Sequence, residues 1–348
     1  MTHLKRRHVV AALGMAALCL STGAAVAQKL DTVRIGVNGV ISDAPFFLAE
    51  TKGFFAEQNI KAEFIPFDAG PQMIAPLGTG QLDVAGGASS AGLFNAAARG
   101  IDIRIVADRG STPPGYEYVP ILVRKELVDS GKVKNFGDLK GLKVAEAGQG
   151  GSQSSMLNEA MKRHGLSYND VEHVFLGYPQ HVAALSSGAV DASVTTEPSA
   201  TQAVQGGYAV RMTDDKIYPN QQVAVLLYGG DFVKKRADVG RRFMIAYLKG
   251  ARVYNGALKD GHLAGPAADE VIKVLVAKAR IKDAELYKAL TPSGINPNGE
   301  INRESLEKDL KFYGDNRFLE GKVELDKVLE PSFVQEALKV VGPYEARK

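Results

Sequence analysis

The chain has 348 residues, enough for two α/β domains, with 45% hydrophobic and 23% charged residues and a formal net charge of +3. This composition is typical of a globular protein, and the small net charge argues against a nucleic-acid partner or a polybasic membrane-binding surface. Cys19 is the one cysteine in the sequence, which excludes an intrachain disulfide.

The first 27 residues have the pattern of a secretory signal peptide. Lys5-Arg6-Arg7 is a basic start, residues 9–20 are apolar but too short to span a bilayer, and Ala25-Val26-Ala27 is a small-residue cleavage signal. We therefore expect cleavage after Ala27 and a periplasmic protein. The Arg6-Arg7 pair leaves twin-arginine export open beside the general secretory route. A lipoprotein cut before Cys19 is disfavoured because Leu18 stands where a small residue is wanted.

Cleavage after Ala27 would change the charge and the chemistry of the chain. It removes three of 42 positive charges and none of 39 negative ones, leaving 39 of each. It also removes Cys19, which excludes thiol catalysis and cysteine-ligated metals in the mature protein.

Strands and helices alternate through the first part of the mature chain. Alternating β-rich segments predict strands at 32–37, 61–66 and 101–107. Helices are expected from Ala44, with Pro45 in the first turn, and at about 70–80 and 90–99. Such alternation indicates parallel β-α-β units.

One short pattern occurs twice, at Leu77–Ala85 and at Leu185–Ser193. Each copy predicts a helix end, a glycine stop, a short strand around an aspartate, and then a loop of small polar residues. We expect Asp83 and Asp191 to hold turns or accept backbone N–H groups rather than to act in catalysis. The loops after such strands are where open α/β sheets bind ligands, so two similar lobes are expected to face one ligand.

The second half of the chain predicts another lobe and a helical tail. Residues 118–124 are an apolar extended run that indicates a crossover, and residues 223–227 indicate the return. Between them we expect strands at 142–146 and 171–176 and helices at 154–164, 180–187 and 199–205. The tail predicts long helices at 239–258, 267–278, 283–290, 303–313 and 331–341, which would form the back of the first lobe.

These elements give an expected domain division. Residues 1–27 form the signal peptide, residues 28–119 together with 226–348 form a discontinuous lobe 1, and residues 120–225 form lobe 2.

The glycine-rich segment Gly148–Ser155 carries the sharpest local signal. A glycine-rich loop between a strand and a helix frees backbone N–H groups, and a helix start favours an anion. The segment lacks the Gly-Lys-Ser/Thr of a nucleotide-binding P-loop, and Gln153 stands where a dinucleotide fingerprint has its third glycine. The loop either merely turns the chain or captures a ligand with its amides and the Ser152 hydroxyl.

Arg109 is a candidate anion ligand because it follows the predicted strand 101–107. There its guanidinium would clamp a carboxylate or sulfonate, although a surface arginine paired with Asp108 or Glu117 is an equal alternative. Several tyrosines lie near predicted loop mouths, where they would be either core residues or a stacking wall: Tyr116, Tyr118, Tyr178 and Tyr228.

No pattern of catalytic chemistry emerges from the sequence. The histidines lack metal-ligand spacing, there is no Gly-x-Ser-x-Gly elbow, and nothing joins a nucleophile to a base. We therefore expect no enzyme, no catalytic residue, no metal and no cofactor.

Several of these segments together resemble the nitrate/sulfonate/taurine class of ABC-transporter substrate-binding proteins, the SsuA/NMT1-like periplasmic solute-binding family. The resemblance runs from about Val33 to Leu227 and is weaker in the helical tail. It implies a type II periplasmic-binding-protein fold, with two α/β lobes, a cleft, two crossover strands and a helical C-terminal region. The segments that carry it are Ala44–Ala49 with Lys52–Phe55, Gly80–Val84, Asp138–Gly141, and Ser187–Ala192 with Glu197-Pro198.

The resemblance also implies ligand-binding residues in the loops of both lobes. Glu197 is ambiguous, because its carboxylate would either face a ligand cation or only brace its loop, and an inward carboxylate beside an anion is costly. The positions implied by the resemblance are Asn38, Ser42, Phe46, Gly87, Ala88, Ser89, Ser152, Gln153, Thr195, Thr196 and Glu197, to which residue chemistry adds Arg109, Tyr116 and Tyr178.

The expected function is that of an exported substrate-binding protein. The resemblance implies capture of a small organic solute by hinge closure and its delivery to the membrane permease of an ABC importer. The aromatic residues and Arg109 favour an anion such as a sulfonate or an aromatic carboxylate. We expect a monomer without a nucleic-acid partner.

The sequence leaves two alternative functions open. The first is a protein that binds a thiamine-precursor pyrimidine or resembles the fungal synthase, whose cysteine-rich iron segment the mature chain lacks. The second is a ligand-sensing partner of a membrane receptor, which would use the same cleft.

Overall fold

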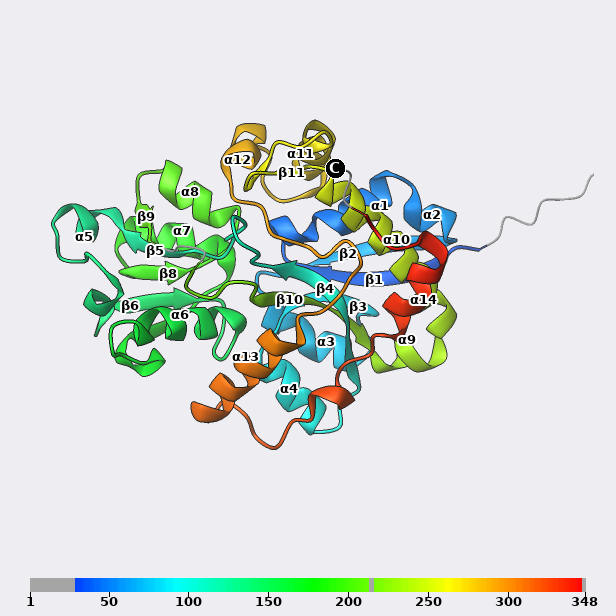
Figure 1. Ribbon diagram of the computed structural model, residues 1–348, viewed down its shortest axis with the longest axis horizontal. Coiled ribbons are helices and arrows are strands. Elements are labelled where there is room, and N and C mark those ends of the chain that lie inside the picture. Colours follow the sequence, from blue (N-terminus) through cyan, green and yellow to red (C-terminus); the bar gives the residue numbers. More distant parts are fainter. Residues whose placement is uncertain (1–28, 213–215, 346–348) are drawn as a thin grey trace, which may run out of the picture.

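The computed structural model describes residues 29–212 and 216–345, so the expected signal peptide, its cleavage site after Ala27 and Cys19 lie outside the described residues. Two five-stranded α/β sheets lie side by side, each at the centre of one lobe (Figure 1). No helix in the described part of the chain is long and apolar enough to cross a membrane. The predicted two-lobed α/β architecture is confirmed.

The sheet of lobe 1 has the strand order β2-β1-β3-β10-β4. β1 runs parallel to β2 and β3, whereas β10, which comes from the far side of lobe 2 in the sequence, runs antiparallel to β3 and β4. The strands are β1 (Asp31–Val37), β2 (Ile60–Pro66), β3 (Val84–Ala88), β4 (Ile103–Ser111) and β10 (Gln222–Gly229). The helices between them are α1 (Ala44–Thr51), α2 (Phe54–Glu57), α3 (Ile74–Gly78) and α4 (Ala91–Ala98).

The sheet of lobe 2 repeats this plan in the order β7-β6-β8-β5-β9. β6 is parallel to β7 and β8, and β5, the first strand after the crossover, is antiparallel to β8 and β9. The strands are β5 (Ile121–Arg124), β6 (Lys143–Glu146), β7 (Glu172–Phe175), β8 (Ala192–Val194) and β9 (Ala209–Arg211). The helices are α5 (Lys125–Asp129), α6 (Ser152–Lys162), α7 (Tyr178–Ser187) and α8 (Ser199–Gln205).

The duplicated sequence pattern has a structural counterpart in the two lobes. Asp83 Oδ2 accepts the backbone N–H of Arg34 on β1 at 2.9 Å, and Asp191 Oδ2 accepts that of Lys143 on β6 at 3.1 Å. Gly188 ends α7 in the left-handed conformation with φ 73°, as a C-cap glycine does. The predicted structural role of both aspartates is confirmed.

The C-terminal helices cover lobe 1, as predicted, but one of them also touches lobe 2. α10 packs on α1, where Phe46 lies 5.4 Å from Tyr247 between ring centroids. Lys308 on α13 pairs with Glu159 on α6 at 2.8 Å, so α13 links the lobes. These elements are α9 (Gly230–Lys235), α10 (Ala237–Asn255), the hairpin β11 (Leu258–Lys259) and β12 (His262–Leu263), α11 (Ala268–Lys278), α12 (Ala284–Ala289), α13 (Arg303–Asp315) and α14 (Ser332–Val341).

The positions of three strands differ from prediction. β3 and β8 begin after Asp83 and Asp191 rather than around them, so Gly87 and Ala88 lie in a strand and not in a loop. β4 continues to Ser111, which places Arg109 within the strand. For β3 and β4 the reason is β10, whose eight residues pair with both strands from a distant part of the sequence, whereas β8 pairs with β5 and β6 in the other sheet.

The domain boundaries remain a prediction. All of β10 from Gln222 pairs within the sheet of lobe 1, and β5 from Ile121 pairs within the sheet of lobe 2.

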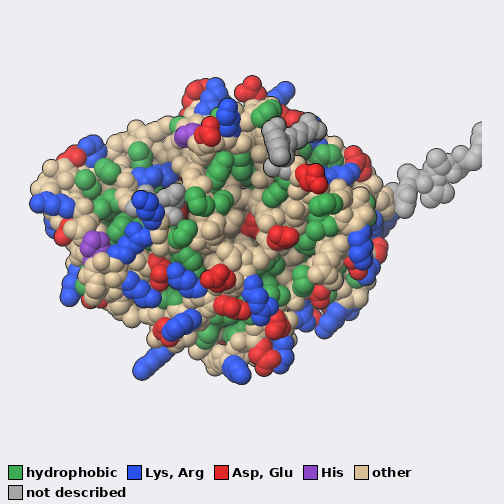
Figure 2. Space-filling view, in the orientation of Figure 1, with side chains coloured by type: hydrophobic (Ala, Val, Ile, Leu, Met, Phe, Trp, Pro, Cys, Tyr) green, Lys and Arg blue, Asp and Glu red, His purple; other side chains and the backbone are tan. Residues whose placement is uncertain are grey.

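Basic and acidic side chains are interspersed over the face seen in Figure 2, in keeping with the small net charge.

Candidate functional site

The loops that follow the parallel strands of both lobes meet between the two sheets. Four backbone hydrogen bonds join them: Ile41 N–H to Glu197 O at 3.1 Å, Ala91 N–H to Gly150 O at 2.7 Å, Ser152 N–H to Ser89 O at 2.9 Å, and Tyr178 N–H to Asp68 O at 3.1 Å. The carboxyl ends of β1, β3, β6 and β8 therefore face one shared region, the position at which open α/β sheets bind ligands.

Seven side chains bring an unusual set of polar atoms to this region. Each atom is shielded from solvent and has no hydrogen-bond partner. We call them the interlobe cluster: Ser42 Oγ, Ser89 Oγ, Arg109 Nε, Tyr118 OH, Gln153 Nε2, Thr195 Oγ1 and Thr196 Oγ1. Leaving one buried polar group unpaired costs about 1–3 kcal/mol, so seven such atoms point to an external hydrogen-bonding partner.

Arg109 is positioned by a buried ion pair with Asp43, the residue before α1. The two side chains are 1% and 0% exposed, and Arg109 Nη2 donates to Asp43 Oδ1 and, at 3.0 Å, to Asn38 Oδ1. The other Asp43 oxygen accepts the backbone N–H groups of residues 38, 39 and 40 at 3.1, 2.7 and 3.2 Å. Arg109 is therefore neither a surface arginine nor a partner of Asp108 or Glu117.

The electrostatics of this pair keep Arg109 charged. Burial lowers the pKa of Arg109, but the charge and hydrogen bond of Asp43 outweigh it and the pKa is raised overall. Glycine at position 86 makes room for the guanidinium, because a Cβ there would lie 2.1 Å from Arg109 Nε. The pair carries no net charge, yet it still presents one buried N–H donor.

Two tyrosines beside Arg109 remain protonated donors. Burial raises the pKa of Tyr118 well above its ordinary value and that of Tyr178 to about 12, although the charge of Arg109 opposes both shifts. A Cβ at Gly110 would lie 2.5 Å from the Tyr118 hydroxyl and 3.3 Å from Cβ of Ser42, so that glycine lets both side chains approach β4.

Several residues predicted to contact a ligand instead pack or hydrogen-bond within the protein. Phe46 is fully buried in the hydrophobic core of lobe 1, with its ring centroid 6.3 Å from that of Phe243. Ser152 Oγ donates to Val223 O at 3.0 Å and so links α6 to β10 across the lobes. Gly87 and Ala88 are strand residues paired with β10.

The contacts of Glu197 favour its bracing role over a ligand contact. Its carboxylate is fully buried and accepts from the backbone N–H of Thr201 at 2.9 Å and from the Thr201 hydroxyl at 3.0 Å. Arg211 on β9 also donates to it. The carboxylate thereby ties the loop after β8 to α8 and β9.

Tyr116 lies outside the interlobe cluster. It lines a separate pocket with Ser111, Asn220 and Asn296, and none of the interlobe cluster lines that pocket. Tyr118, two residues later, joins the interlobe cluster instead. Sequence reasoning left Asp43, Gly86, Gly110 and Tyr118 out of the binding set, although Asp43 directly before Ala44-Pro45 is a recognisable helix-start signal.

One serine–histidine contact resembles a catalytic pair but is closed to substrate. His181 Nδ1 lies 2.7 Å from Ser193 Oγ, and His181 Nε2 lies 3.0 Å from Leu176 O. Burial lowers the pKa of His181 to about 4, which keeps the ring neutral. Both side chains are fully buried, so the contact is structural. Across residues 29–212 and 216–345, no group of three or more His, Cys, Asp or Glu residues could hold a metal ion.

Comparison with known proteins identifies a family and individual proteins that this chain resembles. The model of a family described as NMT1/THI5 like matches residues 41–255. A putative aliphatic sulfonates-binding protein of Escherichia coli (strain K12) is 32% identical over 176 residues, which are 50% of this chain and 52% of that protein. The chain thus aligns with about half the length of this curated relative.

Solved structures extend the likeness to almost the whole chain. The alkanesulfonate-binding protein SsuA from Xanthomonas axonopodis pv. citri, bound to MOPS, matches with a TM-score of 0.70 and 19% identity, over 88% of this chain and all of that one. The periplasmic nitrate-binding protein NrtA from Synechocystis PCC 6803 matches with a TM-score of 0.71 and 15% identity, over 90% of each chain.

The same fold also occurs in an enzyme. The desulfurization enzyme DSZB matches with a TM-score of 0.60 and 15% identity, over 89% of this chain and 99% of that one. These likenesses confirm the predicted periplasmic-binding-protein fold with its two lobes and helical C-terminal region.

Proposed function

We propose that this chain, which belongs to the NMT1/THI5-like family, is a periplasmic solute-binding protein that captures a small organic anion between its lobes for an ABC importer. The observation that carries this proposal is the interlobe cluster. All seven of its atoms can donate a hydrogen bond, and none belongs to a carboxylate. Such a set suits a ligand rich in acceptor oxygens.

The surrounding electrostatics support an anion. The nearby carboxylates of Asp43 and Glu197 are saturated by backbone N–H groups, a hydroxyl and arginines. α6 begins at Ser152 with eleven residues, and its positive end faces the same region. Because Arg109 is already paired, recognition would rest on hydrogen bonds to oxygens more than on net charge.

The chemistry of a sulfonate or carboxylate fits this donor set. Either group offers two or three oxygens for Arg109 Nε, the Gln153 amide and the hydroxyls, while the rings of Tyr118 and Tyr178 lie beside Arg109 for the organic part. The relative from Escherichia coli and the Xanthomonas structure are both named for sulfonates, so alkanesulfonates are the first ligands to test.

Hinge closure is the mechanism that this arrangement supports. The chain passes between the lobes at residues 112–120 and returns between β9 and β10, while the four interlobe backbone hydrogen bonds hold the lobes together. A ligand that hydrogen-bonds Ser42 and Arg109 of lobe 1 and Thr195 and Thr196 of lobe 2 would favour the closed state, because only there do the loops of both lobes reach it. The permease would then receive the closed form.

Calorimetric titration of residues 28–348 with ethanesulfonate, benzoate, nitrate and choline tests the proposal. We expect one-to-one binding of at least one anion and no binding of choline. Thr196→Val removes one cluster hydroxyl and should lower the affinity for that anion by about tenfold, which is the contribution of one hydrogen bond to a charged group. Thr79→Val is the matched control, since Thr79 is exposed and its hydroxyl bonds only the α3 backbone. Binding of choline alone would refute the anion assignment.

A further inference from the structure

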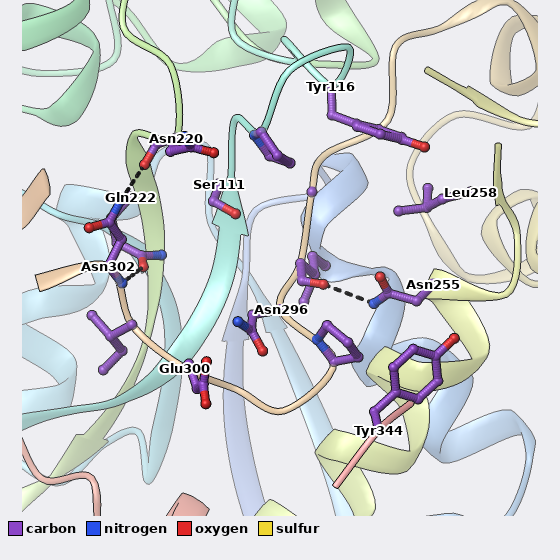
Figure 3. A pocket seen from close by; sticks show the side chains of 15 residues that line it. Ser111, Tyr116, Asn220, Gln222, Asn255, Leu258, Asn296, Glu300, Asn302 and Tyr344 are labelled. Carbon is purple, nitrogen blue, oxygen red and sulfur yellow. Dashed lines mark hydrogen bonds between the residues drawn. The ribbon is translucent and has the colours of Figure 1, made fainter. Parts of the chain in front are cut away.

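A cavity beside the end of β4 and the start of β10 has no part in the site described above (Figure 3). Its volume is about 680 Å³, within the usual range for small-molecule sites. Its walls come from the end of β4 at Ser111, the start of β10 at Gln222, the segment 294–302, and the rings of Tyr116 and Tyr344.

The lining residues separate this cavity from the interlobe cluster. Gly110 lies against Tyr118 and Ser42 of the cluster, whereas its neighbour Ser111 lines the cavity. None of the seven cluster residues lines the cavity, so two ligands could bind without touching the same side chains.

The left wall in Figure 3 is fixed by amide hydrogen bonds. Gln222 Oε1 accepts from Asn302 N at 2.9 Å, and Gln222 Nε2 donates to Asp108 Oδ1 at 2.5 Å. Asn302 Nδ2 donates to Asn220 O at 2.8 Å. These hydrogen bonds hold the start of β10 against the segment 294–302.

The opposite wall is fixed by Arg252 and Asn255. Arg252 donates to Pro297 O at 3.2 Å and to Val341 O at 2.9 Å, and its guanidinium lies 5.7 Å from the ring centroid of Tyr344. Asn255 Nδ2 donates to Ile295 O at 2.9 Å. The guanidinium of Arg252 hydrogen-bonds these backbone carbonyls and so holds this wall in place.

The polar groups that remain available are uncharged with one exception. The Asn220 carboxamide, Asn296 Nδ2, and the hydroxyls of Ser111 and Tyr116 line the cavity and make none of these wall contacts. Among residues 29–212 and 216–345, the fifteen that line the cavity include one carboxylate, Glu300, and no lysine, arginine or histidine. This lining disfavours an anion, in contrast to the interlobe cluster.

We propose that this cavity is a second binding site, for a neutral polyhydroxylated solute of the size of a mono- or disaccharide. Carboxamides and hydroxyls both donate and accept hydrogen bonds, as sugar hydroxyls do, and Glu300 adds an acceptor for two of them. The rings of Tyr116 and Tyr344, with Leu258 between them in Figure 3, supply the apolar surface on which the C–H face of a sugar ring packs.

The test is a titration of residues 28–348 with glucose and sucrose, followed through amide and methyl NMR resonances, with choline and ethanesulfonate as charged comparisons. We expect one of the two sugars to bind at millimolar concentration and to shift resonances of residues that line the cavity. Absence of binding by both sugars, or binding of choline alone at this site, would overturn the proposal.

Two variants locate the site and one controls for general effects. Asn220→Gly removes a lining carboxamide, and glycine readily adopts the φ of 56° found there. Tyr116→Ala removes a lining ring. Each variant should lower the affinity for the sugar by about fivefold to tenfold. Tyr208→Ala removes an exposed ring of lobe 2 and should change nothing. Sugar binding that survives both cavity variants unchanged would place it elsewhere, whatever the outcome for anions.

Discussion

The buried pair of Asp43 and Arg109 gives the sharpest test of the interlobe site, because stability and binding should respond to it differently. Arg109→Gln leaves a fully buried carboxylate without its cation, and breaking such a pair costs about 3–5 kcal/mol. Three backbone N–H groups still bind Asp43 Oδ2, so we expect the lower end, about 3 kcal/mol. Asp43→Asn with Arg109→Gln removes both charges and keeps a hydrogen-bonding pair of similar shape.

The double variant should therefore recover about 2 kcal/mol or more of the stability lost by Arg109→Gln. It should not recover binding, because the guanidinium Nε donor is gone in both variants. The assay is urea unfolding followed by circular dichroism for the wild type, both single variants and the double variant, with ethanesulfonate titrations of each. Additive effects on stability, with a coupling energy below about 0.5 kcal/mol, would refute the ion pair as described. Wild-type affinity in Arg109→Gln would refute its role in binding.

Three further substitutions and one control probe packing and protonation. Gly86→Ala places a methyl group 2.1 Å from Arg109 Nε and should cost about 1–3 kcal/mol and weaken the anion, whereas Gly92→Ala, with only Ser90 Oγ at 3.9 Å, should leave calorimetric affinity unchanged. Burial lowers the pKa of His181 to about 4, below its value of about 6.5 in the unfolded chain, so stability is lost as pH falls through that window at about 1.4 kcal/mol per unit; His181→Gln should flatten this slope in thermal melts. Burial raises the pKa of Asp309 to about 7, above an unfolded value of about 3.9, so stability is lost as pH rises through that window; Asp309→Asn should raise the melting temperature more at pH ~8 than at pH ~5, and an equal effect at both would contradict this.

Local sequence signals predicted most of the architecture. Alternating strands, the proline at the start of α1 and the glycine after α7 act through neighbouring residues, and each was visible in the sequence. The paired aspartates were correctly assigned to backbone N–H groups, although the groups they bind lie on the neighbouring strands β1 and β6, 49 and 48 residues away.

The chemistry of the site depended on contacts that no local pattern encodes. Asp43 and Arg109 are 66 residues apart, and β10, which extends β4 past Arg109, follows more than a hundred residues later. Sequence reasoning therefore placed Arg109 beyond its strand. It also chose Tyr116 over Tyr118, since which of two neighbouring tyrosines faces the lobes is decided by how the crossover leaves β4.

A crystal structure of residues 28–348 with ethanesulfonate would test most directly whether the interlobe cluster binds an anion. We expect the sulfonate between the lobes, with its oxygens within hydrogen-bonding distance of Arg109 Nε, Gln153 Nε2 and the hydroxyls of Thr195 and Thr196. A sulfonate bound elsewhere, or between the lobes with these donors left unpaired, would contradict it.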